Sequence, residues 1–283
     1  MSRPMASVSF AKMHGCGNSF VIIDDRRNRI RHEAAVAREL CSREFGIGAD
    51  GLMLLRPSRR YDFRMSYRNA DGSIGEMCGN GIRCLARFVH DRGISREREL
   101  VFETGAGPIR TRVSGARRAH VRQVAVDMGE PRLRSRDVRG LTADRTSLRV
   151  GRRTFTFVSM GNPHAVTFVD DFDFDLAVEG RRVEENRRIF PNGTNVEFVQ
   201  VRSAEALRLR VWERGCGITL ACGTGACAAV VAATLAGHVH RGPVEVAVDG
   251  GELLIEWNIP RRAVLMTGPA TLTAEGTVRL PDR

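Results

Sequence analysis

Two cysteines in this sequence lie in nearly the same setting, which favours acid–base chemistry by sulfur. Cys78 lies in GEMCGNGIRC (75–84) and Cys222 in TLACGTGACA (219–228), and each begins a Cys-Gly-x-Gly run ahead of a helical pattern. Backbone N–H groups at a helix N-terminus attract anions and favour the thiolate form of a cysteine placed there. Each half of the chain therefore offers a reactive sulfur beside a place suited to a carboxylate.

Two such sulfurs suit the inversion of a carbon next to a carboxylate, provided that they flank one small molecule. A thiolate on one face removes the proton and a thiol on the other face returns one. The charge that develops moves into the carboxylate, which helix N-termini stabilise. Lys12 is the only lysine and lies in no recognisable cofactor motif, so a pyridoxal phosphate enzyme is disfavoured and no cofactor is expected.

The chain matches itself at an offset of 144 residues, the step from Cys78 to Cys222. At the same offset Asn18 falls on Asn162, so that each cysteine follows its asparagine by the same distance. One ungapped match that carries both features predicts two homologous halves.

Short segments in which β-branched and aromatic residues alternate with charges indicate half-buried antiparallel strands. They are 20–24, 51–55, 63–67, 100–104, 109–113, 121–128, 155–160, 165–169, 195–201, 207–212, 244–248 and 253–257. Helical patterns cover 32–46, 80–92, 176–190 and 224–236, and the last is apolar on nearly all sides, as in a helix that passes through a core. We expect an α+β fold of two pseudo-symmetric domains, each a curled, mostly antiparallel sheet around a central helix.

The domain boundary is expected in the polar, weakly periodic stretch 128–147. Residues 1–127 form the N-terminal half with Cys78, and residues 128–283 the C-terminal half with Cys222. A last strand near 269–283 is a candidate to return to the N-terminal domain.

The composition disfavours several classes of protein. The net charge is +11, but the basic residues are scattered arginines and aromatic residues make up only 6%, which is poor for nucleic-acid binding. Seven cysteines without a secretion signal indicate a reducing cytoplasm, and their spacings do not match zinc sites, so no metal is expected. The uncharged stretch 215–237 is long enough to span a membrane, but its Gly, Ala, Thr and Cys content favours a buried helix.

A resemblance to the diaminopimelate epimerase family rests on five motifs along residues 9–268. They are KMHGCGNSF (12–20), NADGSIGEMCGNGIRC (69–84), MGNPHAV (160–166), NVEF (195–198) and ERGCGITLACGTGACAA (213–229). The resemblance implies a cofactor-independent epimerase that converts LL-diaminopimelate to the meso isomer in lysine and peptidoglycan synthesis. It also implies two pseudo-symmetric domains, a homodimer in the cytoplasm, and no nucleic-acid or membrane partner.

The resemblance also implies roles for individual residues. Cys78 is the donor and Cys222 the acceptor in the LL-to-meso direction, and His164 and Glu213 tune these thiols. The substrate-binding positions are Asn18, Asn69, Gly79, Asn80, Asn162, Asn195, Glu213, Arg214, Gly223 and Thr224. Among them the Gly79-Asn80 and Gly223-Thr224 pairs hold the α-carboxylate with backbone N–H groups, and Arg214 suits the distal carboxylate through a bidentate pair.

Four positions depart from the family pattern, and other functions stay open. Ile218 stands where Glu is usual, Ser19 where Asp is common, Cys16 where Leu is common, and Gly51 where some members have Gln. The nearest alternative is another thiol-pair isomerase, such as a proline or hydroxyproline racemase, for which Arg214 would be idle. A basic nucleic-acid-binding protein and a zinc or redox protein are the alternatives from other classes. The remaining cysteines are assigned to packing.

Overall fold

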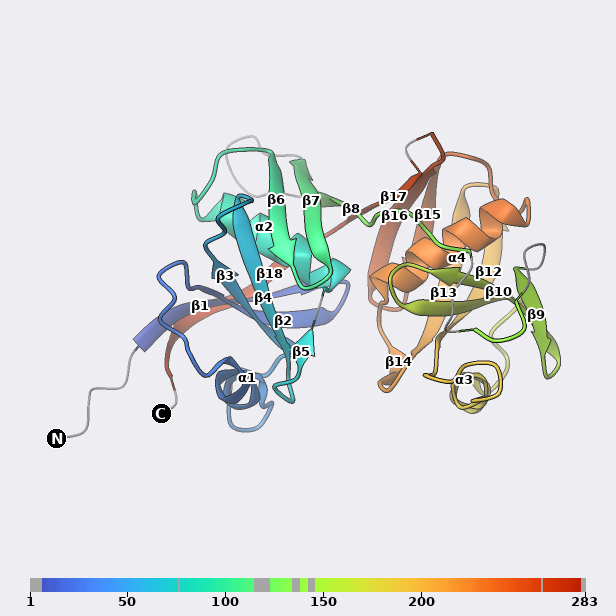
Figure 1. Cartoon of the computed structure of the whole chain (residues 1–283), viewed down its shortest axis with the longest axis horizontal. Coiled ribbons are helices and arrows are strands. Elements are labelled where there is room, and N and C mark those ends of the chain that lie inside the picture. Colours follow the sequence, from blue (N-terminus) through green and yellow to red (C-terminus); the bar gives the residue numbers. More distant parts are fainter. Residues whose placement is uncertain are drawn as a thin grey trace. The chain divides into compact units, whose positions relative to one another are not determined.

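The chain divides into two units, which are described one at a time. The structure is a computed structural model that describes residues 7–75, 77–114, 123–133, 138–141, 146–260 and 262–280. Unit 1 comprises Met1–Val126 and Gly268–Arg283, and unit 2 comprises Asp127–Thr267 (Figure 1). The domain boundary expected from the sequence stays a prediction, and parts of the stretch that was expected to join the halves, 134–137 and 142–145, lie outside the described residues.

Unit 1 is a mixed sheet with two helices. Its strands are β1 (Ser7–Gly15), β2 (Asn18–Asp24), β3 (Gly51–Arg56), β4 (Phe63–Asn69), β5 (Ile74–Gly75), β6 (Glu99–Thr104), β7 (Gly107–Ser114), β8 (Gln123–Asp127) and β18 (Thr271–Arg279), and its helices are α1 (Glu33–Cys41) and α2 (Gly79–Asp91). The strands pair in the order β18-β1-β2-β3-β4-β6-β7-β8, with β5 on β4. The β2–β3 and β4–β6 pairs are parallel and the other pairs are antiparallel.

Unit 2 repeats this pattern. Its strands are β9 (Ser147–Val150), β10 (Arg153–Ser159), β11 (Pro163–Phe168), β12 (Asn195–Ser203), β13 (Ala206–Glu213), β14 (Gly217–Thr219), β15 (Pro243–Val248), β16 (Gly251–Asn258) and β17 (Ala263–Gly268), and its helices are α3 (Leu176–Glu184) and α4 (Gly223–Leu235). The order is β9-β10-β11-β12-β13-β15-β16-β17, with β14 on β13. Among the described strand pairs of unit 2, β11–β12 and β13–β15 are parallel and the others are antiparallel.

The two units therefore have the same topology, and the offset of 144 residues holds in the structure. Helix α2 begins at Gly79 and α4 begins at Gly223, and both are 13 residues long. The same offset relates β6 to β15 and β7 to β16 without adjustment. The expectation of an α+β fold with two pseudo-symmetric halves and a mostly antiparallel sheet in each is confirmed.

Each sheet is covered on both faces, which decides where its side chains point. In unit 2, Val196 and Phe198 of β12 belong to a core cluster with Leu176 and Val183 of α3. Because side chains alternate along a strand, Asn195 and the other odd-numbered residues of β12 face the opposite side, toward α4. In unit 1, the corresponding cluster joins β2 and β3 to α1. The helices α2 and α4 thus lie on the faces that carry the predicted site residues.

Helices α1 and α3 are shorter than their sequence patterns suggest. Helix α1 ends at Cys41 instead of residue 46, because Ile47 N donates to Leu40 O (2.8 Å) and Ala49 N to Cys41 O (3.1 Å), so that the returning chain bonds to the last helical carbonyls. Helix α3 ends at Glu184 and continues as turns around Asn186. Each of the twelve predicted strands overlaps an observed one, but residues 128, 160 and 169 lie one position beyond the observed ends. Residues 121–122 of one prediction lie outside the described part of the chain. Strands β1, β5, β9, β14 and β17 were not predicted.

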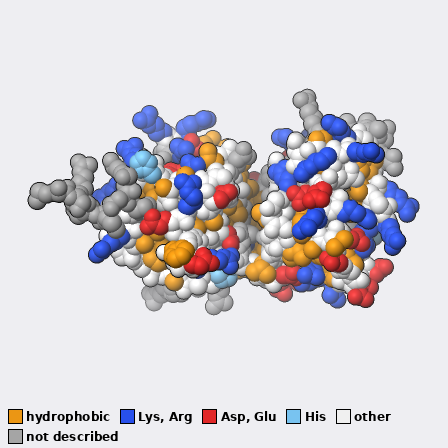
Figure 2. Space-filling view, turned by 90° about the horizontal axis from the view of Figure 1, so that it is seen from below, with side chains coloured by type: hydrophobic (Ala, Val, Ile, Leu, Met, Phe, Trp, Pro, Cys, Tyr) orange, Lys and Arg blue, Asp and Glu red, His pale blue; other side chains and the backbone are white. Residues whose placement is uncertain are grey.

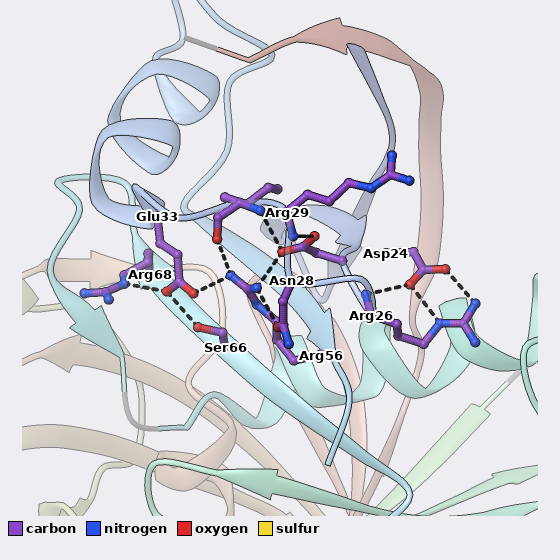
Figure 3. A network of polar contacts seen from close by, with 10 residues as sticks. Asp24, Arg26, Asn28, Arg29, Glu33, Arg56, Ser66 and Arg68 are labelled. Carbon is purple, nitrogen blue, oxygen red and sulfur yellow. Dashed lines mark hydrogen bonds and ion pairs between the residues drawn. The ribbon is translucent and has the colours of Figure 1, made fainter. Parts of the chain in front are cut away.

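A buried polar network ties α1 to the sheet of unit 1 (Figure 3). Arg56 of β3 contacts Asp25 Oδ2 (2.7 Å) and Glu33 Oε1 (2.8 Å), and donates to Asn28 Oδ1 (2.8 Å). Arg68 Nε donates to the other oxygen of Glu33 at 3.1 Å. Glu33 is the first residue of α1, so its carboxylate also lies at the positive end of that helix.

The charged surface is mixed in sign. In Figure 2, Lys and Arg side chains are interspersed with Asp and Glu on the face drawn. Within the described ranges, no helix is both long and apolar enough to cross a membrane. The uncharged stretch near α4 instead holds a 13-residue helix in which only Thr224, Thr234 and Leu235 are not buried.

Candidate active site

In unit 1, Cys78 is the residue immediately before helix α2. Its backbone is extended (φ −138°, ψ 118°), and its carbonyl accepts the first helical hydrogen bond from Ile82 N at 2.8 Å. Because the N–H groups of a helix's first turn have no partner within the helix, this end of α2 attracts an anion beside the sulfur. Cys78 is half-buried, and its Sγ donates to Asn18 Oδ1 at 3.4 Å.

Asn18 is oriented by Asp50. Asp50 Oδ2 accepts from Asn18 Nδ2 (3.1 Å), from Ser19 N (2.7 Å) and from Ser19 Oγ (3.1 Å). The amide of Asn18 therefore presents its oxygen to Cys78, and Asn80 Nδ2 donates to the same oxygen at 3.4 Å. The structure thus brings Asn18, Cys78 and Asn80 together. Asp50 was missed by the sequence analysis, although it is the Asp of the GADG stretch in which Gly51 was noted.

Asn69 and Gly51 lie around the ring of Tyr67. Asn69 Oδ1 accepts from the Tyr67 hydroxyl at 2.7 Å, and its Nδ2 donates to Ser73 Oγ at 2.9 Å. A side chain at Gly51 would meet the Tyr67 ring at 2.6 Å, and one at Gly75 would meet it at 2.1 Å. The glycine at position 51 is therefore required by this packing of Tyr67, which explains one departure from the family pattern.

In unit 2, Cys222 is the residue immediately before helix α4. Its backbone is again extended (φ −114°, ψ 110°), but the side chain is buried and Sγ contacts Thr224 Oγ1 at 3.5 Å. Burial, followed by the negative charges of Glu213 and Glu197, raises the pKa of the Cys222 thiol well above its usual value, against smaller opposing effects of Thr224 and Gly225 N–H. These effects together favour the thiol form of Cys222.

Asn162 and His164 connect to Cys222 through Thr224. Asn162 Nδ2 donates to Thr224 Oγ1 at 3.3 Å, and Asn162 Oδ1 lies 3.0 Å from His164 Nε2. The structure therefore brings four predicted residues of unit 2 together in one hydrogen-bonded chain.

Glu197 is a site residue that the sequence analysis missed. Its side chain is fully buried, and Oε1 lies 2.7 Å from His164 Nδ1. Burial is the largest effect on its carboxyl and raises its pKa, against the opposing effect of His164. The available signal was the motif NVEF itself, in which a Glu interrupts an apolar strand.

Glu213, Arg214 and Asn195 gather at the end of β13. Thr219 Oγ1 donates to Glu213 Oε1. Asn195 accepts from Arg214 N at 3.0 Å and donates to Pro163 O at 2.9 Å, so both ends of its amide are engaged by the backbone. The Arg214 side chain is exposed and donates to Asn192 O at 3.3 Å.

The remaining cysteines differ in exposure. Cys16, Cys41, Cys84 and Cys227 are buried, in agreement with a packing role, but Cys216 is exposed, so its assignment to packing is wrong. Cys216 lies in the turn between β13 and β14, where its N–H bonds to Glu213 O at 3.0 Å. Among the described residues, no group of three or more His, Cys, Asp or Glu side chains is placed to hold a metal ion.

Comparison with known proteins identifies relatives over nearly the whole chain. The family model described as diaminopimelate epimerase matches residues 10–134 and 156–273. A diaminopimelate epimerase of Desulfitobacterium hafniense is 46% identical over 281 residues, which cover 96% of this chain and 98% of the relative. One of Moorella thermoacetica is 46% identical over 276 residues, which cover 94% and 98%.

Solved structures share the fold at low sequence identity. A probable proline racemase from Agrobacterium radiobacter with bound carbonate has a TM-score of 0.71 at 16% identity, covering 97% of this chain and 93% of that chain. A hydroxyproline epimerase from Agrobacterium vitis with bound trans-4-hydroxy-L-proline has a TM-score of 0.69 at 18% identity, covering 99% and 95%. A PhzF-family phenazine biosynthesis protein from Bacillus anthracis has a TM-score of 0.70 at 17% identity, covering 98% and 100%. These likenesses establish the fold.

Proposed function

The chain belongs to the diaminopimelate epimerase family, and we propose that it interconverts LL- and meso-2,6-diaminopimelate with Cys78 and Cys222 as the acid–base pair. One observation carries this proposal: each sulfur immediately precedes a helix of 13 residues and belongs to a hydrogen-bonded group that contains an asparagine from the equivalent place in its unit. Inversion at an α-carbon needs a base on one face and an acid on the other, and each unit supplies one sulfur.

The helix N-termini supply the stabilisation that this reaction needs. Removing the α-proton of an amino acid places negative charge on the neighbouring carboxylate. We assign to that carboxylate the N–H groups of Gly79 and Asn80, the first two residues of α2, and of Gly223 and Thr224, the first two residues of α4. Fixed N–H donors lower the energy of the transition state because they need no reorientation as the charge develops.

The protonation state of Cys222 has a consequence for direction. The family assigns Cys222 as the acceptor from LL-diaminopimelate, which requires its thiolate, whereas its raised pKa favours the thiol in the free protein. The form with a Cys222 thiol is ready to donate a proton once Cys78, as thiolate, has removed one from the bound isomer. The two reactive forms, with the thiolate at Cys222 or at Cys78, carry the same number of protons, so a change of pH changes the populations of both alike.

The second amino-acid centre of the substrate needs contacts of its own. We assign the exposed guanidinium of Arg214 to the distal carboxylate, because its planar donors match a carboxylate. We assign Glu213 to the substrate and to the tuning of Cys222, together with His164. Asn18, Asn69, Asn162 and Asn195 complete the proposed polar contacts. Asn195 also supports the Arg214 turn through the backbone bond described above.

A second candidate is a related thiol-pair racemase that acts on another amino acid. Ile218 favours it, because its side chain is 45% exposed at a position where the family usually has Glu. A substrate without a second charged centre would suit this apolar surface better than diaminopimelate does.

We also propose that the chain acts in the cytoplasm as a homodimer, without a cofactor and without nucleic-acid or membrane partners. The family resemblance supports the dimer, and the interspersed surface charges support the absence of a nucleic-acid partner. Light scattering after size-exclusion chromatography tests the dimer. Retention on a heparin column tests for nucleic-acid binding, and the chain is expected to pass through at moderate salt.

Proton NMR of LL-diaminopimelate in D2O, with reductant, tests the reaction. The wild type is expected to remove the α-proton signal and to form the meso isomer, and both Cys78→Ala and Cys222→Ala are expected to lose this activity. Cys41→Ala is the cysteine control, because Cys41 is buried in the unit 1 core, and it should keep its activity. Exchange that persists in Cys78→Ala or Cys222→Ala would contradict the two-thiol mechanism. No exchange by the wild type would reject this substrate and favour the second candidate.

A further inference from the structure

The two halves of the chain differ chemically at one pair of equivalent buried positions. At the offset of 144 residues, Met53 of β3 corresponds to Glu197 of β12, and Phe20 of β2 corresponds to His164 of β11. All four side chains are at most 1% exposed. Unit 1 therefore has a thioether and a phenyl ring where unit 2 has a carboxyl group and an imidazole.

In both units this pair lies beneath the first turn of the helix that follows the cysteine. A Cβ built on Gly81 of α2 would lie 1.7 Å from Met53 Cε and 3.3 Å from Phe20 Cζ. A Cβ built on Gly225 of α4 would lie 2.8 Å from Glu197 Oε1 and 3.3 Å from Cys222 Sγ. The carboxyl oxygen of Glu197 and the Cys222 sulfur thus both border the space that a side chain at position 225 would fill.

Hydrogen bonds extend from Glu197 to Cys222 in four steps. Glu197 Oε1 lies 2.7 Å from His164 Nδ1, His164 Nε2 lies 3.0 Å from Asn162 Oδ1, and Asn162 Nδ2 donates to Thr224 Oγ1 at 3.3 Å. Thr224 Oγ1 lies 3.5 Å from Cys222 Sγ. Glu197 is the inner end of this chain, so its position limits where His164 and Asn162 can lie.

The hydrogen-bond pattern indicates a shared proton between Glu197 and His164. With the Asn162 amide donating to Thr224, its oxygen accepts from His164 Nε2–H, and one further proton occupies the contact between His164 Nδ1 and Glu197 Oε1. No donor among the described residues reaches Glu197 Oε2, which is buried. Burial raises the pKa of this carboxyl, as expected if it holds a proton part of the time. The other ionisable groups that act on Glu197 and Cys222 are His164 of β11 and Glu213 of β13.

We propose that Glu197 is a positioning residue for Cys222: it holds His164 and Asn162 in the hydrogen-bonded chain that ends at the sulfur, and so gives this thiol different surroundings from those of Cys78. Met53 and Phe20 cannot form the same hydrogen bonds in unit 1, because their side chains are a thioether and a phenyl ring. The inference deepens the proposed function by giving the two thiols different chemical surroundings. Its test below does not depend on the identity of the substrate.

Site-resolved alkylation tests the proposal. The purified chain is treated with a small haloacetamide between about pH 6 and pH 10, and mass spectrometry follows the peptides of Cys222 and Cys78 separately. The alkylation rate follows the thiolate fraction, so its midpoint reports proton affinity at each sulfur. Cys78 in the same sample is the internal control, because Glu197 belongs to the other unit.

Two substitutions at position 197 separate charge from packing. Glu197→Gln keeps the shape and removes the carboxyl group, and Glu197→Met installs the residue that unit 1 accepts at the same place. In both, the Cys222 midpoint is expected to fall by at least about half a unit, which is about a threefold rise in thiolate fraction below the midpoint, whereas the Cys78 midpoint stays unchanged. The double variant His164→Phe with Glu197→Met reproduces the unit 1 pair and should behave like Glu197→Met.

Phe198→Leu is the matched control for loss of stability. Phe198 is the next residue of β12, is equally buried, and faces α3 instead of α4. It should lower the stability of the chain without moving the Cys222 midpoint. A Cys222 midpoint that stays at its wild-type value in both Glu197→Gln and Glu197→Met would overturn the proposal, as would an equal shift at Cys78.

Epimerase assays distinguish a failure of this inference from a failure of the proposed function. Where the wild type exchanges the α-proton of diaminopimelate, the two single variants are expected to lower kcat about tenfold with KM changed less than about threefold, and to shift the pH profile. Where the wild type shows no exchange, the proposed function is rejected, and a selective shift at Cys222 would still support the role of Glu197.

Discussion

Cys78 and Cys222 occupy the same backbone position but have different side-chain partners. Each has an extended backbone and immediately precedes a 13-residue helix. Cys78 is half-buried and donates to Asn18, whereas Cys222 is buried and contacts Thr224. The duplicated fold therefore places both sulfurs by the same backbone geometry. The side chains around each sulfur then set its proton affinity separately.

Loss of Asp50 should reduce activity through Asn18. Asp50→Ala removes three hydrogen bonds to Asn18 and Ser19, so the Asn18 amide loses the contact that orients it toward Cys78. We expect kcat/KM to fall about tenfold, equivalent to about 1.4 kcal/mol. Arg43→Ala is the control, because Arg43 contacts the other oxygen of Asp50 at 3.3 Å from an exposed position. Equal activity of Asp50→Ala and the wild type would show that Asn18 does not depend on Asp50.

Removal of Arg56 should destabilise unit 1. Arg56→Met leaves the buried Asp25 carboxylate and the Glu33 carboxylate without their common partner (Figure 3). Breaking a buried ion pair on one side costs about 3–5 kcal/mol. Urea unfolding measures this loss. Arg26→Met, which breaks an exposed pair with Asp24, should cost less than about 1 kcal/mol, and a similar loss in both variants would contradict the role of burial.

A methyl group at position 225 should impair catalysis more than stability. In Gly225→Ala the new Cβ would lie 2.8 Å from Glu197 Oε1, so the carboxyl group and the nearby sulfur must move. We expect kcat to fall about tenfold or more, while the higher helix propensity of Ala offsets part of the strain by up to about 1 kcal/mol.

Gly237→Ala is the control, because it should lower stability and leave catalysis unchanged. Gly237 has a φ of +74°, and apart from its neighbours in the chain no atom of the described residues lies within 4 Å of an added Cβ. The left-handed backbone should cost about 1–2 kcal/mol of stability and leave kcat unchanged. Thermal unfolding and initial rates on both variants measure the contrast. A Gly225→Ala protein with wild-type kcat would mean that the sulfur tolerates the displacement.

Stability should fall steeply in alkali because of buried thiols. Burial raises the pKa of the Cys84 thiol from its ordinary value of 9.0 to about 12. Between these values the unfolded chain releases the thiol proton and the folded chain keeps it, so the stability present below pH 9 is lost as the pH rises toward 12. Each such thiol contributes a slope of about 1.4 kcal/mol per pH unit.

Urea midpoints at pH 8, 9.5 and 10.5 measure this slope. Cys84→Ala should lower stability at pH 8. It should also reduce the fall of stability with pH by about 1.4 kcal/mol per pH unit, the contribution of one thiol. Cys216→Ala, at an exposed thiol, should leave the slope as it is. An unchanged slope in Cys84→Ala would show that Cys84 ionises in the folded protein at an ordinary pH.

The sequence predicted α2 and α4 well because their signals are local. The Cys-Gly-x-Gly runs mark the N-termini of both helices, and their apolar patterns persist to the ends. The internal match at 144 residues then predicted the shared topology, because two copies of one unit must pair their strands alike. The position of α1 and α3 was also predicted, but their ends depend on contacts from residues that return later in the chain.

The burial of Glu197 could not be predicted from the alternation of residues along its strand. In NVEFVQV the residues alternate at first, so that Asn195 and Glu197 are expected as polar positions on the solvent side of a half-buried strand. That reading fails because α4 covers this face and α3 covers the other, so Glu197 is buried together with Val196 and Phe198. When helices cover both faces of a sheet, the alternation of polar and apolar residues along a strand does not tell which positions are exposed.

The pairing of β1 with β18 constrains the order in which the chain acquires its structure during synthesis. Ser7 is in register with Arg279, and Arg83 and Arg87 of α2 donate to the carbonyls of Pro269 and Ala270, just before β18. A ribosome delivers all of unit 2 before it delivers β18. Unit 1 therefore begins first along the chain but is completed last, because it needs β18. The edge of β1 that pairs with β18 stays unpaired while unit 2 folds.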